Sequence, residues 1–236
     1  MSLDLSHIRV LSFDLDDTLW DGHSVILSAE KSMHDWMLDH TPKVFERFSK
    51  DTLREHKFEF IKHHPHLINK ISLARQAYLS ELFSQLNYSD YQQKSEACFK
   101  AFYQARQNVT LFQGVAEALA TLKKHYPLIA ITNGNADIQL AGLGNFFDFS
   151  LKAEDFDRPK PHGDIFHQAL QQANINADQC LHIGDHPVHD MQGAYDMGMK
   201  TCWLKDGKRE WNQDFTAHLE IAHISELLPI LIKNTE

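Results

Sequence analysis

VLSFDLDDTL, residues 10–19, is the stretch that decides the fold. It begins as an apolar run and then changes abruptly into a group of carboxylates at Asp14, Asp16 and Asp17. A short apolar run bounded by polar residues is typical of a strand buried in a parallel sheet. Like charges crowded at the end of such a strand cost stability unless a positive charge joins them. The stretch therefore predicts a buried strand that ends at a cation site.

The second half of the chain repeats this pattern. Short apolar runs stand at residues 128–132, 180–184 and 201–204, and helical patterns stand at 115–125, 137–143, 164–173 and 188–197. A closing helix is expected over residues 224–234, which Pro229 either interrupts or starts. Alternation of strands and helices is typical of a doubly wound α/β sheet. We therefore predict a mainly parallel, Rossmann-like sheet.

Residues 24–107 differ from the rest of the chain. They contain no glycine, and apolar side chains recur at helical spacing, as at Leu79, Leu82 and Phe83. This pattern predicts an all-helical insert, a cap, placed after the first strand. We expect an α/β core in residues 1–20 and 108–236, and a helical cap domain in residues 21–107.

Composition excludes several classes of protein. The net charge of −9 argues against a protein that coats nucleic-acid phosphates. No apolar segment is long enough for a membrane, and no signal peptide is evident at the N-terminus. The cysteines at 98, 180 and 202 are far apart in sequence, so neither a disulfide framework nor a zinc site is expected. These features predict a soluble, cytoplasmic protein without nucleic-acid or membrane partners; its oligomeric state stays open.

The stretch HHPH, from His63 to His66, could suggest a metal site within the insert. It has no carboxylate or cysteine beside it, so a solvated or partner-facing group of histidines is the favoured interpretation. Its role stays open.

Polar residues follow the predicted strands, at the edge of the sheet where ligands gather. They are Asp14, Asp16 and Thr18 after the first strand, Thr132 and Asn133 after the second, Lys160 before a helix, and Asp185 and Asp190 after the third. Carboxylates from two segments, completed by water and phosphate oxygens, suit Mg²⁺. Thr132 and Lys160 would supply a hydrogen bond and a positive charge to a phosphate. Each motif alone could be a turn, a helix cap or a solvated lysine, so the convergence carries the prediction.

Four segments resemble, in order, the motifs of the haloacid dehalogenase-like superfamily. They are DLDDTL (14–19), ITNGN (131–135), RPKP (158–161) and GDHPVHD (184–190). The resemblance implies that Asp14 is a nucleophile that forms an aspartyl-phosphate. It implies that Asp16 protonates the leaving group and then activates water. Mg²⁺ would be held by Asp14, Asp185 and the backbone carbonyl of Asp16.

The same resemblance implies phosphate binding by Thr132, Asn133 and Lys160. Asp190 and Thr18 would support these groups, with Asp190 orienting Lys160 or a metal-bound water. Trp20 either contacts substrate or packs where the core gives way to the insert.

The activity that the resemblance implies is a Mg²⁺-dependent phosphatase for small phosphorylated metabolites. Asp16 favours phosphoryl transfer, because the dehalogenases of the superfamily lack an acidic residue there. Residues 26–30, 131–136, 142–149 and 181–204 resemble bacterial phosphatases of riboflavin biosynthesis, which act on 5-amino-6-(5-phospho-D-ribitylamino)uracil and FMN. A broad sugar-phosphate or nucleotide phosphatase, or a phosphomutase, stays open. A receiver-like phospho-acceptor module is disfavoured, because the acidic pair follows the first strand and a large insert intervenes.

Overall fold

The computed structural model describes residues 4–232, which fall into two compact units. One unit joins Met1–Gly22 to Thr110–Glu236, and the other is His23–Val109. The helical unit begins and ends two residues later than the expected 21–107. A β-bridge between Trp20 and Leu111 joins the two connecting segments within the α/β core.

The core is built on a six-stranded sheet in which all neighbouring strands are parallel. The strands are β1 (Val10–Phe13), β2 (Leu128–Thr132), β3 (Phe149–Lys152), β4 (Cys180–Gly184), β5 (Lys200–Leu204) and β6 (Leu219–Ile221). Their order in space is β3-β2-β1-β4-β5-β6. The chain extends the sheet from β1 to one side and then crosses over to build the other side. This confirms the predicted doubly wound fold and makes the ends of β1 and β4 the expected place for a site.

The sequence predicts the four inner strands and misses the two at the edges. β1, β2 and β4 are buried along their whole length, and so is most of β5. β3 is only half-buried, and β6 is three residues long. Edge strands pair on one side only, so they do not need the continuous apolar run that reveals a central strand.

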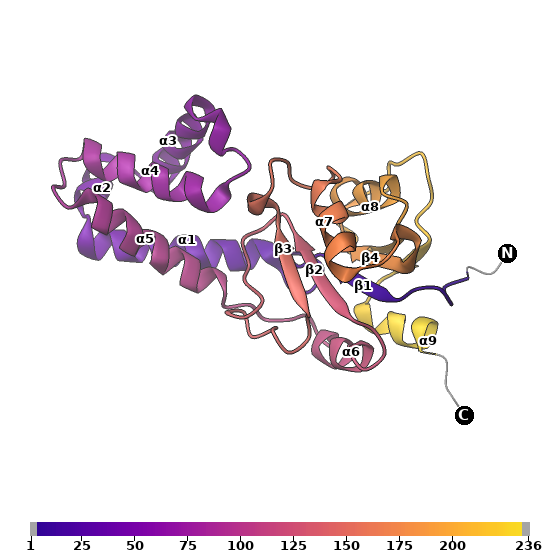
Figure 1. The fold of residues 1–236 in the computed structure, drawn as a ribbon. Coiled ribbons are helices and arrows are strands. Elements are labelled where there is room, and N and C mark those ends of the chain that lie inside the picture. Colours follow the sequence, from indigo (N-terminus) through magenta and orange to yellow (C-terminus); the bar gives the residue numbers. More distant parts are fainter. Residues whose placement is uncertain (1–3, 233–236) are drawn as a thin grey trace. The chain divides into compact units, whose positions relative to one another are not determined.

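Helices cover both faces of the sheet. In the core they are α6 (Val115–Leu122), α7 (Asp164–Ala173), α8 (Gly193–Asp196) and α9 (Leu227–Leu231), with single turns η2 (Ala153–Asp155), η3 (Ala177–Gln179) and η5 (Ile224–Glu226). Figure 1 shows α7 and α8 on one face and α6 and α9 on the other. Ile165 and Phe166 of α7 pack with Val10 and Ile131, which ties this helix to the central strands.

Two predicted core helices are wrong in part. Residues 137–143 form turns, because the Asp137 carboxylate accepts the N–H groups of Gln139 and Leu140 and Gly142 then takes a positive φ of 76°. The helix predicted over 188–197 starts with a π-helical segment, η4 (Pro187–Gln192), and continues as α8. The last two residues of the predicted closing helix, 233 and 234, lie outside the described part of the chain.

The second unit is all-helical, as expected for an insert after the first strand. Its elements are α1 (Gly22–His40), α2 (Lys43–Arg47), α3 (Lys50–His63), η1 (Pro65–Leu67), α4 (Ile71–Gln85) and α5 (Tyr91–Arg106). Its core includes Met33, Leu79, Phe83 and Phe102. Throughout residues 4–232, no helix is long and apolar enough to cross a bilayer.

The histidines of residues 63–66 lie at the C-terminal end of α3. Nδ1 of His63 lies 2.8 Å from the Glu59 carbonyl oxygen, and Nδ1 of His64 lies 2.8 Å from that of Phe60. The His64 ring also stacks on Phe60, with centroids 4.1 Å apart. The imidazole groups thus supply hydrogen bonds to carbonyl oxygens near the C-terminal end of α3, where a helix leaves carbonyl groups without backbone partners.

The helical unit depends on the burial of Leu79 in α4. Replacing this fully buried side chain by alanine should lower the free energy of unfolding by about 3 kcal/mol, through lost burial and the cavity left behind. Leu73→Ala, on the same helix but 52% exposed, is the matched control and should change stability by less than about 0.5 kcal/mol. Urea unfolding followed by circular dichroism measures both; equal losses would contradict this assignment of the core.

Candidate active site

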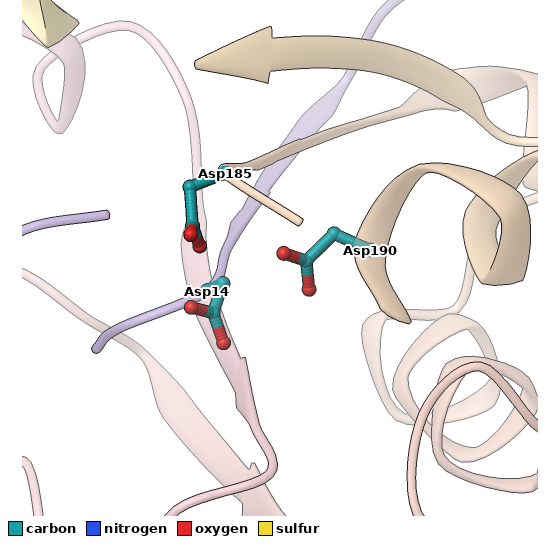
Figure 2. Close-up of side chains that lie close together, drawn as sticks. All are labelled: Asp14, Asp185 and Asp190. Carbon is teal, nitrogen blue, oxygen red and sulfur yellow. The ribbon is translucent and has the colours of Figure 1, made fainter. Parts of the chain in front are cut away.

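The polar residues meet at the carboxyl ends of β1 and β4. Asp14 directly follows β1, and its N–H donates to the Ile183 carbonyl at 2.9 Å, which continues the strand pairing. Asp185 directly follows β4, and Asp190 lies in η4. Figure 2 shows the three carboxylates facing a common space. One oxygen from each lies within 4.8 Å of the others, and all three residues are buried.

Lys160 supplies the positive charge of this cluster. Its Nζ donates to Asp14 Oδ1 at 2.6 Å, to Asp190 Oδ1 at 2.6 Å and to the Ile131 carbonyl at 2.7 Å. These three bonds use all three hydrogens of an ammonium group that is 2% exposed. In this arrangement Lys160 would act on a phosphate through its charge, more than through a hydrogen bond of its own.

The backbone of Lys160 is held by the side chain of Asn133. The Lys160 N–H donates to Asn133 Oδ1 at 2.9 Å, and Asn133 Nδ2 donates back to the Lys160 carbonyl at 3.1 Å. The side chain that the sequence assigns to phosphate binding is therefore engaged in positioning the lysine. Thr132 Oγ1 accepts the N–H of Gly134 at 2.9 Å, so its own O–H is left to donate.

Thr18 and Trp20 hold the carboxylates that follow β1. Thr18 Oγ1 lies 3.1 Å from Asp185 Oδ1 and 3.4 Å from Asp14 Oδ2, between the two strand ends. The Trp20 indole donates to Asp16 Oδ1 at 2.8 Å. Trp20 is fully buried, which agrees with the packing alternative.

Two glycines allow these groups to approach. A Cβ on Gly184 would lie 2.5 Å from Asp190 Cγ, and one on Gly22 would lie 2.8 Å from Asp16 Cβ. Both separations are far below contact distance, so a side chain at either position would displace a site carboxylate.

The pKa values indicate a surplus of negative charge. Burial raises the pKa of Asp14 well above its usual range, although Lys160 lowers it, and Asp190 and Asp185 add to the rise. Burial and then Asp190 raise the pKa of Asp185 to about 7. Burial would also raise the pKa of Asp190, but Lys160 holds it well below its usual range. Lys160 lowers the pKa of Asp190 most, and the Arg209 guanidinium offsets only part of the rise at Asp185, so Asp14 and Asp185 still favour a further cation.

A cavity of about 150 Å³ opens beside this cluster. Among the predicted site residues, those in its wall are Asp14, Asp16, Thr132, Asn133, Lys160, Asp185 and Asp190. The fold therefore brings together side chains that are separated in the sequence by as many as 176 positions, from Asp14 to Asp190.

Residues 8–198 match the haloacid dehalogenase-like hydrolase family. The chain belongs to this family. The match covers every segment that carries the four motifs, so the resemblance seen in the sequence is confirmed.

Relatives of this haloacid dehalogenase-like hydrolase have several names. It is 30% identical to Escherichia coli 5-amino-6-(5-phospho-D-ribitylamino)uracil phosphatase YigB, over 96% of this chain and 98% of that protein. It is 28% identical to the glyceraldehyde 3-phosphate phosphatase of Pyrococcus furiosus, over 96% and 94%. A crystal structure described as 2-haloacid dehalogenase from Pseudomonas syringae pv. Tomato superposes with a TM-score of 0.88, at 34% identity over 95% and 98%.

The family site also contains residues that the sequence did not indicate. Arg209, in the loop after β5, contacts Asp185. His182 of β4 lies beneath the site, with Nδ1 2.8 Å from Ser12 Oγ and Nε2 3.6 Å from Asp190 Oδ1. Burial lowers the pKa of His182, so the ring is neutral. Arg209 follows a predicted strand, which was the available signal; a histidine inside a strand gives none.

The raised pKa of Asp185 predicts how stability depends on pH without metal. Its carboxyl binds a proton below about pH 7 when folded but only near its usual value of 3.8 when unfolded. Between the unfolded pKa and the folded pKa of Asp185, the folded state binds one proton more than the unfolded state. The stabilisation of the folded protein by this proton is therefore lost as the pH rises towards the folded pKa. In EDTA, the unfolding free energy of wild type minus that of Asp185→Asn should fall by about 1.4 kcal/mol per unit from pH 5 to 7.

Subtracting the unfolding free energy of the variant from that of wild type removes the contribution of the histidines, which are the same in both proteins. Denaturant unfolding at several pH values measures it. A difference that rises with pH, or stays constant, would show that Asp185 is not protonated in the folded protein.

Proposed function

We propose that this protein hydrolyses small phosphate monoesters with Mg²⁺, through a phosphorylated Asp14. The chain is a hydrolase acting on phosphate esters, as its family and its relatives named as phosphatases indicate. The proposal concerns the metal, the intermediate and the substrate. The observation that carries the proposal is the contact between Lys160 Nζ and Asp14 Oδ1, at 2.6 Å. This contact holds the buried Asp14 carboxylate beside a positive charge, which a bound phosphate also needs.

The carboxylates fit a divalent cation. Oxygens of Asp14, Asp185 and Asp190 converge, and the pKa values of Asp14 and Asp185 are raised, first by burial and then by the neighbouring carboxylates. We propose that Asp14, Asp185 and the backbone carbonyl of Asp16 hold Mg²⁺, a cation that prefers such oxygens. When bound, the ion would neutralise charge on the phosphate oxygens.

In the first step a carboxylate oxygen of Asp14 attacks phosphorus, and the bond from phosphorus to the ester oxygen breaks. Asp16 donates a proton to the leaving oxygen, with its carboxyl oriented by the Trp20 indole. In the second step Asp16 takes a proton from water, which attacks phosphorus and releases phosphate from Asp14. Lys160 stabilises the charge on the phosphate in both steps, and the Thr132 hydroxyl donates to one of its oxygens.

The proposed substrate is 5-amino-6-(5-phospho-D-ribitylamino)uracil or FMN. The support is the full-length similarity to YigB, whose name includes the first of these compounds. Glyceraldehyde 3-phosphate is an alternative, since the Pyrococcus relative is named for it. A broad sugar-phosphate or nucleotide phosphatase and a phosphomutase also use this kind of site.

A second candidate is dehalogenation, because the similar Pseudomonas protein is described as a 2-haloacid dehalogenase. Halide leaves without a proton, so that reaction has no use for an acid beside the nucleophile. Asp16 lines the cavity, two residues from Asp14, and is oriented by Trp20. The acid therefore favours a leaving alkoxide, and with it the phosphatase.

A product screen tests the function. Phosphate release should be measured over 5-amino-6-(5-phospho-D-ribitylamino)uracil, FMN, glyceraldehyde 3-phosphate, sugar phosphates and nucleotides, and chloride release from 2-chloropropionate. We expect phosphate release with Mg²⁺, highest for one of the first two compounds, and no chloride release. Isomerised sugar phosphate without free phosphate would identify a phosphomutase, and chloride release would replace the proposal by dehalogenation.

Asp14→Asn should abolish turnover, because an amide cannot form the acyl-phosphate. The expected loss in kcat is at least about a thousandfold, or roughly 4 kcal/mol of transition-state stabilisation. Circular dichroism should show an intact fold. More than a tenth of wild-type activity in this variant would exclude Asp14 as the nucleophile.

Asp16→Asn should slow alkyl phosphates more than p-nitrophenyl phosphate, because p-nitrophenolate leaves without needing a proton. Single-turnover experiments isolate the leaving-group step. We expect a loss larger by at least about tenfold for the alkyl ester. Equal losses for both substrates would mean that Asp16 is not the acid.

A further inference from the structure

Arg209 places a positive charge on a proposed metal ligand. Its Nη1 donates to Asp185 Oδ2, and the same nitrogen donates to Asp206 Oδ2 at 3.1 Å. Its Nη2 lies 3.5 Å from Asp17 Oδ2. The guanidinium is thus surrounded by three carboxylates, of which only Asp185 belongs to the buried cluster with Asp14 and Asp190.

Asp185 is fully engaged in this arrangement. Thr18 Oγ1 donates to its Oδ1 at 3.1 Å, while Arg209 donates to its Oδ2. A divalent ion bound to this carboxylate would stand close to the guanidinium, and the two positive charges would repel each other, since Asp185 is buried and Arg209 is only partly exposed. The Arg209 guanidinium and the divalent ion would therefore both be stabilised by the negative charge of Asp185, and each disfavours the other there.

We propose that Arg209 competes with the divalent ion for Asp185 and thereby sets the metal affinity of the enzyme. The inference rests on the proposed metal site. Arg209 acts through Asp185 and has no part in the chemical steps.

Asp206 and Asp17 make this competition reversible. Both already contact Arg209, and both lie outside the carboxylate cluster, so the guanidinium can leave Asp185 while keeping two ion pairs. Lys208, the residue before Arg209, lies 3.7 Å from Asp17, and its side chain is 58% exposed. It therefore offers a control for simple charge removal near the site.

The loop that carries Arg209 has an internal reporter. Trp211 packs against Trp203, with ring centroids 5.0 Å apart, and its indole donates to the Phe215 carbonyl at 2.9 Å. Trp203 Nε1 in turn donates to the Asp185 carbonyl at 2.9 Å. Movement of Arg209 away from Asp185 should therefore alter the environment of Trp211, two residues further along the chain.

Calorimetric titration of the full-length, metal-free protein with MgCl₂ tests the competition. Arg209→Gln should bind Mg²⁺ about tenfold more tightly than wild type, because the competing charge is gone. Arg209→Lys, which keeps the charge, should stay nearer to wild type. Lys208→Gln, the matched single-charge control, should change the dissociation constant by less than about twofold. If the Mg²⁺ dissociation constant of Arg209→Gln lies within twofold of the wild-type value, or is larger, the proposal is overturned.

Asp206→Asn provides a test in the opposite direction, and the single variant alone does not depend on the folding of Arg209→Gln. Loss of this alternative partner should leave Arg209 on Asp185 and weaken Mg²⁺ binding severalfold. In the Arg209→Gln background the same change should have a smaller effect. An effect of equal size in both backgrounds would mean that Asp206 acts on the ion directly, which overturns the proposed exchange.

Tryptophan fluorescence gives a readout independent of activity. Adding Mg²⁺ to wild type should change the emission, and Trp211→Phe should reduce that change by the part that reports on the Arg209 loop. If wild type shows no Mg²⁺ binding by calorimetry, the proposed metal site fails and this inference with it. If wild type binds Mg²⁺ but Arg209→Gln binds it no more tightly, this inference alone fails and the phosphatase proposal stands.

Discussion

The buried ammonium of Lys160 is the group on which the rest of this core depends. A charge that is 2% exposed is tolerated only when its hydrogens are all used and opposite charges stand beside it. Asp14, Asp190 and the carbonyl of Ile131 meet both requirements, and they come from three different segments of the chain. Each of these segments is then constrained in turn.

The constraints spread outward from that nitrogen. Asn133 fixes the backbone of Lys160, so the end of β2 is tied to the loop before α7. Gly184 has to lack a side chain because Asp190 lies against it. Asp14, Lys160 and the end of β2 are thus positioned by the same bonds that stabilise the fold, which is how a rigid site is built on a sheet edge.

Much of this arrangement could be predicted from the sequence, because the residues involved follow simple geometric rules. β1, β2 and β4 are short, mostly apolar runs, and the carboxyl ends of parallel strands meet at one edge, so the sequence alone could place Asp14, Thr132 and Asp185 together. β3 and β6 could not be found in this way, since edge strands carry no such run.

The sequence signal for Arg209, its position after a predicted strand, was too weak to assign it to the site, for a different reason. It stands among Lys205, Asp206 and Lys208, a charged stretch that reads as a solvated loop, and no spacing rule connects residue 209 to residue 185. The positioning role of Asn133 was hidden as well, because an Asn-Gly pair after a strand is ordinary turn chemistry. Contacts between side chains of loops that are distant in sequence can be predicted only when the fold is known.

The position of β1 has a consequence for the synthesis of the chain. β1 is the first strand made, yet its two partners in the sheet are β2 and β4, and the whole helical unit is made before either of them. The ribosome therefore releases an apolar strand with both edges unpaired, and it stays so until residue 132 has emerged. Strand edges of this kind pair readily with other chains. The helical unit, with a core of its own, can fold during that interval, while the α/β core has to wait for its distant partners.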